Sequence, residues 1–116
     1  MINIPLTVMN ILMEIRKNRK LYEELMDKFI EKINKALDEV FKKYPELRNR
    51  GAIISCAMIS AVMTFIIGSI DCTFSDEQRR RELCLVWKYI VSILCDQAFM
   101  EYLSTLPSKE KRYDVV

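Results

Sequence analysis

The spacing of hydrophobic and polar positions along this chain predicts four helical segments. Between residues 5 and 17 the apolar side chains form one broad stripe, with Pro5 in the first turn, where its missing N–H costs no hydrogen bond. Polar residues at 16–20 then break the pattern. Residues 21–44 keep an apolar period of about 3.6 residues, and Pro45 ends this second segment. We expect a kink near Asn34, because the segment is long for a globular helix.

The third segment, residues 52–70, reads AIISCAMISAVMTFIIGSI and contains no charged side chain. We expect it to be a helix that opens near residues 49–51 and closes near Asp71. Small residues recur along it, and these let neighbouring backbones approach closely both in a crowded protein core and in a membrane. Every face of such a helix must be hidden from water.

Ser75 and Gln78 have the spacing of a capping box, which predicts that the fourth helix begins there. An apolar stripe that includes Trp87 lines this helix, with an expected interruption near residues 95–96. We expect one domain over residues 1–106, followed by a flexible tail at 107–116. The predicted fold class is all-α: a compact helical bundle around a central buried apolar helix.

The uncharged third segment has a second interpretation, because about 20 apolar residues suffice to cross the hydrocarbon core of a bilayer. The other three segments are amphipathic, however, and their apolar stripes need a shared surface to cover. The ends of the third segment carry Arg48, Arg50 and Asp71 rather than the aromatic residues that favour membrane interfaces. We therefore favour a buried hub over a membrane span. A third helix left bare along one side in the isolated chain would contradict this choice.

Composition excludes several classes of function. The chain has two glycines, no histidine and four cysteines without a CxxC pair, so we expect no phosphate-binding loop, metal, cofactor or enzymatic activity. The formal net charge is +2, and no aromatic residue is interleaved with the basic clusters, so we expect no nucleic-acid partner. Unpaired cysteines in helical patterns favour a reducing, cytosolic compartment.

Several short motifs resemble the core of the Bcl-2 family of apoptosis regulators. A helix that ends in Glu39-Val40-Phe41 is followed by Asn49-Arg50-Gly51 at the start of the apolar segment, and Trp87 lies in the middle of the next helix. The resemblance covers about residues 21–102. Its remaining parts are Leu94-Cys95-Asp96 on the fourth helix and a leucine and acidic-apolar signature on the second helix at Leu25, Asp27 and Phe29.

The chain also departs from the family pattern. Arg50 and Ala52 stand where the family usually has Trp and Arg, so the arginine that pairs with the ligand's aspartate is displaced by two positions. Arg50 or Arg48 is the candidate replacement. The Gly-Gly-Trp found near the end of many members is absent after Phe99, and we expect no carboxy-terminal anchor. Such trimming resembles the divergent Bcl-2 proteins of large DNA viruses such as poxviruses and iridoviruses.

The resemblance implies an inhibitor of host apoptosis that sequesters the amphipathic death-promoting helix of pro-apoptotic Bcl-2 relatives in a hydrophobic groove. It would act in the host cytoplasm or at the mitochondrial surface. For each apolar residue of this groove, ordinary core packing is the alternative, and Asn49 can equally be a helix N-cap. The implied groove residues are Phe29, Ile33, Leu37, Val40, Phe41, Asn49, Arg50, Gly51, Ile53, Ile54 and Ala57.

Two other functions stay open from the sequence. One is a small membrane effector with residues 52–70 as a single span in the bilayer. The other is a structural helical dimer, in which the apolar surface closes on a second copy of the chain.

Overall fold

The structure is a computed structural model that describes residues 2–107. Within that range the chain is all-helical, as predicted. The elements in order are α1 (Ile4–Lys17), α2 (Arg19–Lys43), a short 3-10 helix η1 (Pro45–Asn49), α3 (Gly51–Thr73) and α4 (Glu77–Ser104). Of the predicted tail at 107–116, residues 108–116 lie outside the described residues.

Local polar groups set the helix ends. The Asn3 side chain accepts a hydrogen bond from the Leu6 backbone N–H at 3.0 Å and caps α1. Asn18 ends α1, and its backbone N–H donates to the carbonyls of Glu14 and Ile15. At the start of α4 the structure corrects the predicted cap by one position, because the Asp76 side chain, rather than that of Ser75, accepts from the Gln78 N–H at 3.2 Å.

The expected interruptions do not occur. α2 continues through Asn34, and α4 continues through residues 95–96. In an uninterrupted helix of this length the apolar side chains form continuous stripes. Which surface covers each stripe depends on how the helices pack together.

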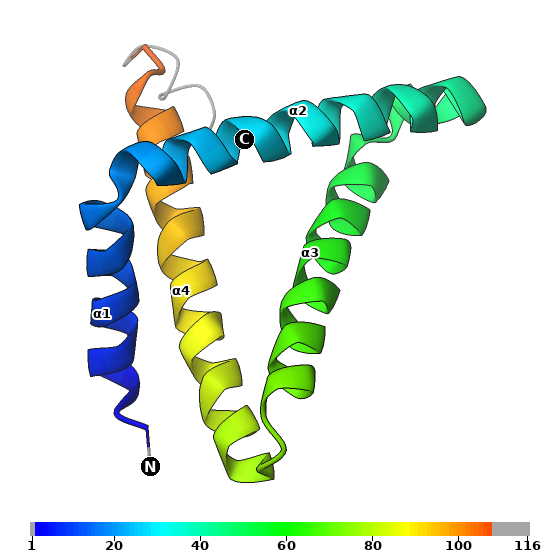
Figure 1. Cartoon of the computed structure of the whole chain (residues 1–116). Coiled ribbons are helices and arrows are strands. Elements are labelled where there is room, and N and C mark those ends of the chain that lie inside the picture. Colours follow the sequence, from blue (N-terminus) through cyan, green and yellow to red (C-terminus); the bar gives the residue numbers. More distant parts are fainter. Residues whose placement is uncertain (1, 108–116) are drawn as a thin grey trace, which may run out of the picture.

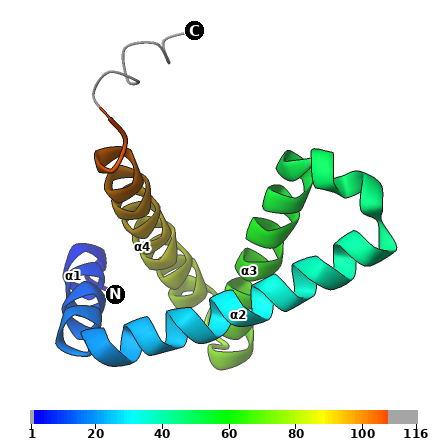
Figure 2. The ribbon, with the colours of Figure 1, turned by 90° about the horizontal axis from the view of Figure 1, so that it is seen from above.

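The helices are arranged as an open frame (Figure 1). α1 and α4 lie side by side and run in the same direction, while α3 runs the opposite way and meets α4 at the turn that connects them. α2 crosses one end of the frame, from α1 to the start of α3 (Figures 1 and 2). Two ends of the frame are therefore defined: the α2 end and the turn end.

The core lies between α1 and α4. It consists of Val8 from α1 together with Val86 and Ile90 from α4, and the two α4 residues are almost completely buried. Half-buried residues such as Leu12 and Leu94 pack around it. Fully burying an aliphatic side chain contributes about 1.5–3 kcal/mol. The three buried residues of this small core come from α1 and α4, so the core joins these two helices.

The structure corrects the prediction of a central buried helix. Among the residues of α3, Ile70 alone is buried. The whole chain exposes 10061 Å², whereas a compact folded protein of this mass exposes roughly 6,600 Å². The frame is thus open rather than compact, because the amphipathic segments do not converge on α3.

Candidate functional site

Most of the predicted groove residues lie near the corner where α2, η1 and α3 meet, whereas Phe29 and Ile33 lie in the middle of α2, and the set does not form two facing walls. Leu37, Val40, Phe41 and Ile54 are half-buried there, whereas Phe29, Ile33, Ile53 and Ala57 are exposed. Within the described residues, α2 and α3 pack on η1 rather than on each other. The structure does not test whether a partner helix binds here, and the groove stays a prediction.

The polar residues at this corner are placed by η1. Asn49 is the last residue of η1, and Arg50 precedes α3, with its backbone N–H donating to the Leu47 carbonyl at 2.9 Å. The Arg50 side chain makes no capping hydrogen bond and is exposed. Arg48 has its guanidinium 4.8 Å from the centre of the Phe41 ring, a cation–π distance. A Cβ added at Gly51 would meet no atom within 4 Å.

A more extensive feature is a belt of exposed apolar side chains around α1, α3 and α4, which we call the apolar belt. Monomeric soluble proteins rarely expose apolar patches of more than a few hundred Å². Phe65 of α3 is 75% exposed, and Ile59 is 64% exposed. The large exposed hydrophobic members of the belt are Leu6, Met9, Met13, Ile53, Met58, Ile59, Val62, Phe65, Ile67, Leu85, Tyr89, Phe99 and Met100.

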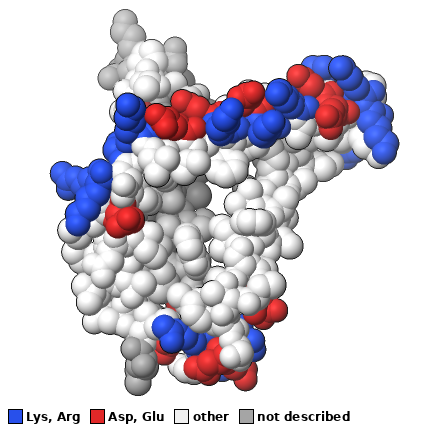
Figure 3. All heavy atoms as spheres, viewed as in Figure 1, with Lys and Arg blue, Asp and Glu red and all other residues white. Residues whose placement is uncertain are grey.

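Charged side chains lie above and below the apolar belt. Figure 3 shows them along α2 at one end and around the α3–α4 turn at the other, with uncharged atoms between. The turn-end charges include two ion pairs, Arg80 with Asp71 at 3.7 Å and Arg81 with Glu77 at 2.7 Å. From Gly51 to Asp71 α3 rises about 30 Å, and from Glu82 to Glu101 α4 rises about 28 Å. Both lengths match the hydrocarbon thickness of a bilayer, about 30 Å.

By length and composition, both α3 and α4 can cross a membrane. The core helix of a soluble protein can pass the same test, but such a helix is mostly buried. Here only 6% of the most apolar part of α3 is buried, and 11% of that part of α4. Between Glu82 and Glu101, α4 carries two further charged residues, Lys88 and Asp96. Lys88 is about 9 Å from Glu82 along the axis, and Asp96 is about 8 Å from Glu101.

Three hydroxyl groups in the second half of α3 are satisfied within their own helix. Thr64 donates to the Ser60 carbonyl at 2.7 Å, Ser69 to the Phe65 carbonyl at 3.0 Å and Thr73 to the Ser69 carbonyl at 2.6 Å. An unsatisfied polar group in hydrocarbon costs several kcal/mol. These internal bonds let an exposed helix carry hydroxyls without needing water.

Aromatic side chains also lie at the two levels where the charges begin. Tyr22, Tyr44 and Tyr102 are at the α2 end, and Phe74 and Trp87 line a hollow near the turn end. Tyrosine and tryptophan favour membrane interfaces. These residues come from other helices and from the turn, so the sequence next to α3 does not reveal this arrangement.

A hydrogen bond closes α1 onto α4 at the turn end. The Ile2 backbone N–H donates to a Glu82 carboxylate oxygen at 2.9 Å, and the Gln78 side chain donates to the other oxygen at 3.2 Å. These two bonds, the backbone bond from Ile2 first, lower the pKa of Glu82 below its ordinary value of 4.5. Their strength depends on an ionised carboxylate.

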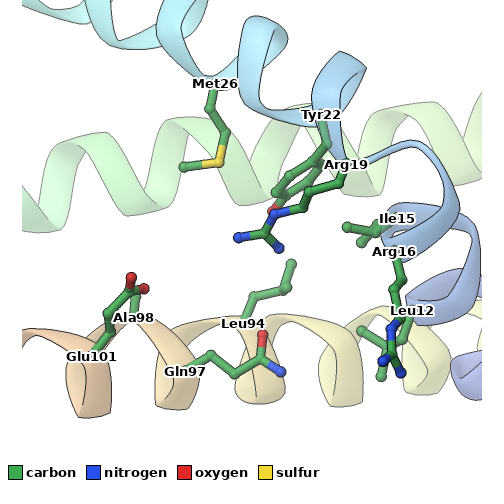
Figure 4. A pocket seen from close by; sticks show the side chains of 10 residues that line it. All are labelled: Leu12, Ile15, Arg16, Arg19, Tyr22, Met26, Leu94, Gln97, Ala98 and Glu101. Carbon is green, nitrogen blue, oxygen red and sulfur yellow. The ribbon is translucent and has the colours of Figure 1, made fainter.

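At the α2 end, a cavity of about 430 Å³ lies between α1, α2 and α4. Its polar lining includes Arg16, Arg19 and Tyr22 on one side and Gln97 and Glu101 of α4 on the other (Figure 4). Sequence reasoning treated the basic residues as solvated helix ends. Their meeting with α4 depends on contacts between segments far apart in the chain.

Comparison of the chain with protein-family models, with curated proteins and with solved structures finds no significant match. The function must therefore be inferred from the geometry of the chain itself.

Proposed function

We propose that this chain is an integral membrane protein whose α3 and α4 cross the bilayer as a helical hairpin. α1 packs on α4 within the membrane, and α2 lies along one membrane surface. The protein acts as a membrane-embedded scaffold that presents the charged face of α2 to the aqueous phase. This extends the single span considered from the sequence to a hairpin.

One observation carries the proposal: α3 has no charged side chain between residues 52 and 70, yet almost all of its surface is exposed. In water this exposure would be strongly unfavourable, at about 25 cal/mol per Å² of apolar surface. In a bilayer, lipid tails cover the same surface. The match between helix length and hydrocarbon thickness supports the same conclusion.

The distribution of basic residues supports one orientation. Residues 16–50 contain eleven lysines and arginines, whereas the turn end has Arg79, Arg80 and Arg81. Loops rich in Lys and Arg stay on the cytoplasmic side of a membrane. We therefore place α2 on the cytoplasmic surface and the α3–α4 turn on the opposite side.

Alkaline carbonate extraction of expressing cells tests the membrane assignment. We expect the chain to stay in the membrane pellet, and its release into the supernatant would refute the hairpin. Orientation is tested in microsomes with engineered N-glycosylation acceptor sequences. We expect an acceptor inserted at residues 74–76 to be glycosylated and one inserted at residues 45–50 to remain unmodified.

The inhibitor of apoptosis suggested by the family resemblance has a weaker structural basis. Its premise was a third helix sheathed by its companions, and that premise is not met. Titration of a death-promoting helix peptide into the purified protein still tests it directly, with Arg50→Glu expected to weaken binding more than Arg80→Glu. A structural dimer is tested by light scattering of the purified protein.

A further inference from the structure

We propose that the cavity between α1, α2 and α4 binds the headgroup of a zwitterionic phospholipid with a primary amine, the chemistry of phosphatidylethanolamine. The assignment rests on the membrane placement proposed above. That placement puts the cavity at the α2 end, at the level of lipid headgroups. Its volume of about 430 Å³ is within the range of small-ligand sites, roughly 300–1,000 Å³.

Two guanidinium groups supply the phosphate-binding chemistry. Arg16 comes from the last turn of α1 and Arg19 from the first turn of α2, so the break at Asn18 brings both to one cavity. In Figure 4 the Arg19 guanidinium points from α2 toward α4. Its Nε atom donates to Glu23 at 3.0 Å. The planar donor array of arginine matches phosphate oxygens, and donors beyond Nε can serve a ligand.

The Glu101 carboxylate, on the opposite side of the cavity, selects the ammonium group of the headgroup. Glu101 lines the cavity from α4 and forms no ion pair within the described part of the chain. Outside the lining, Glu23 pairs with Arg19 at 3.0 Å, so two carboxylates and two guanidinium groups balance one another in and beside the cavity. An anionic lipid gains no net attraction from such a balance. A zwitterion gains two local interactions, phosphate with the arginines and ammonium with Glu101.

The remaining surface of the cavity suits lipid chains. Leu12 and Ile15 of α1, Met26 of α2 and Leu94 and Ala98 of α4 give the cavity an apolar lining alongside the charged groups. Leu12 and Leu94 also pack against the α1–α4 core, so the lining continues into the apolar belt. A soluble phosphate compound would leave this lining uncovered, and a phospholipid would cover it.

Native mass spectrometry of the purified protein in detergent tests the site by titration with three lipids that differ in headgroup. Phosphatidylethanolamine is expected to bind at least about fivefold more tightly than phosphatidylcholine, which cannot donate a hydrogen bond to Glu101, or phosphatidylglycerol, which has no ammonium. The double variant Arg16→Gln with Arg19→Gln should weaken phosphatidylethanolamine binding at least about tenfold. Lys32→Gln with Lys42→Gln removes the same charge from α2 away from the cavity, and should leave binding unchanged.

Glu101→Gln provides an independent variant, expected to abolish the preference for phosphatidylethanolamine over phosphatidylcholine. Equal binding of these two lipids to the unmodified chain would overturn the assignment. So would equal effects of the arginine and lysine double variants, with helical content by circular dichroism confirming that both fold. Competition by soluble glycerophosphoethanolamine as strong as that by the lipid would exclude a lipid ligand. Carbonate extraction of the same variants separates the two proposals, since a failed lipid site leaves them in the membrane pellet.

Discussion

Replacing Val62 by arginine distinguishes a lipid-covered α3 from a water-covered one. Val62 lies at the centre of α3, eleven residues from either end, which corresponds to about 16 Å of helix. An arginine side chain cannot reach either charged end across that distance by snorkelling. The valine is 55% exposed, so the larger side chain meets no tightly packed neighbour.

The two environments predict very different free-energy costs. At an exposed site of a water-soluble protein, a surface substitution changes stability by about 0.5 kcal/mol or less. At the centre of a membrane span, an arginine costs about 2.5–3.5 kcal/mol on insertion scales, and the lost valine adds a few tenths. The sum of about 3 kcal/mol corresponds to roughly a 150-fold change in the insertion equilibrium. No other charge lies between residues 52 and 70 to offset it.

Glycosylation-mapped insertion in microsomes measures this change as the fraction of chains that span the membrane. Val62→Arg is expected to lower that fraction sharply, while Val62→Leu should leave it unchanged. Thr73→Arg is the positional control, because it puts the same charge at the turn end, where it should cost little. Unchanged insertion of Val62→Arg would refute the placement of α3 in lipid.

Three further outcomes follow from the structure. The hydrogen bond from the Ile2 N–H lowers the pKa of Glu82. The ionised Glu82 carboxylate therefore stabilises the fold fully above the ordinary pKa of glutamate, and this stabilisation is lost as pH falls through the lowered pKa. Glu82→Gln should remove this part of the acid sensitivity of thermal unfolding. Ile90→Ala should lower the free energy of unfolding by about 2–3 kcal/mol, because it opens a cavity in the α1–α4 core. In single-cysteine variants within membranes, a water-soluble maleimide should label Cys72 at the turn end faster than Cys95 in the apolar belt, although both are exposed in the isolated chain.

Each of these outcomes can be contradicted. An acid-dependent loss of stability that persists in full in Glu82→Gln would assign it to another group. An Ile90→Ala variant as stable as the parent would mean that α1 does not pack on α4. Equal labelling rates for Cys72 and Cys95 in membranes, with equal rates also in detergent, would mean that lipid shields neither thiol.

Sequence reasoning predicted the helices well, because helix formation and termination depend on neighbouring residues. Pro5 near the start of α1 and Pro45 after α2 mark their ends by backbone chemistry alone. The cap of α4 was misplaced by one residue, since Ser75 and Asp76 are both good capping residues. Which of these two neighbouring residues becomes the cap depends on their backbone angles, and both side chains are compatible with that position.

The arrangement of the helices was not predictable by the same means. An apolar stripe such as that of α2, with Leu25 and Phe29, looks the same whether it will face a protein core or lipid. The prediction of a buried hub assumed that all stripes share one protein surface. The cavity at the α2 end was missed for a related reason, because Arg16 and Glu101 are distant in the sequence and line one cavity only through the packing of α1 on α4.

The pairing of α1 with α4 has a consequence for biogenesis. Val8 and Val86, which share the core, leave the ribosome about 4–16 seconds apart at ordinary elongation rates. During that interval α1 lacks α4, on which its core residue packs, and at 14 residues it is too short to cross the membrane alone. If α3 and α4 form the proposed membrane hairpin, the hairpin assembles before α1 docks on it. A chain released before α4 is complete would expose its apolar amino-terminal segment to chaperones and proteases.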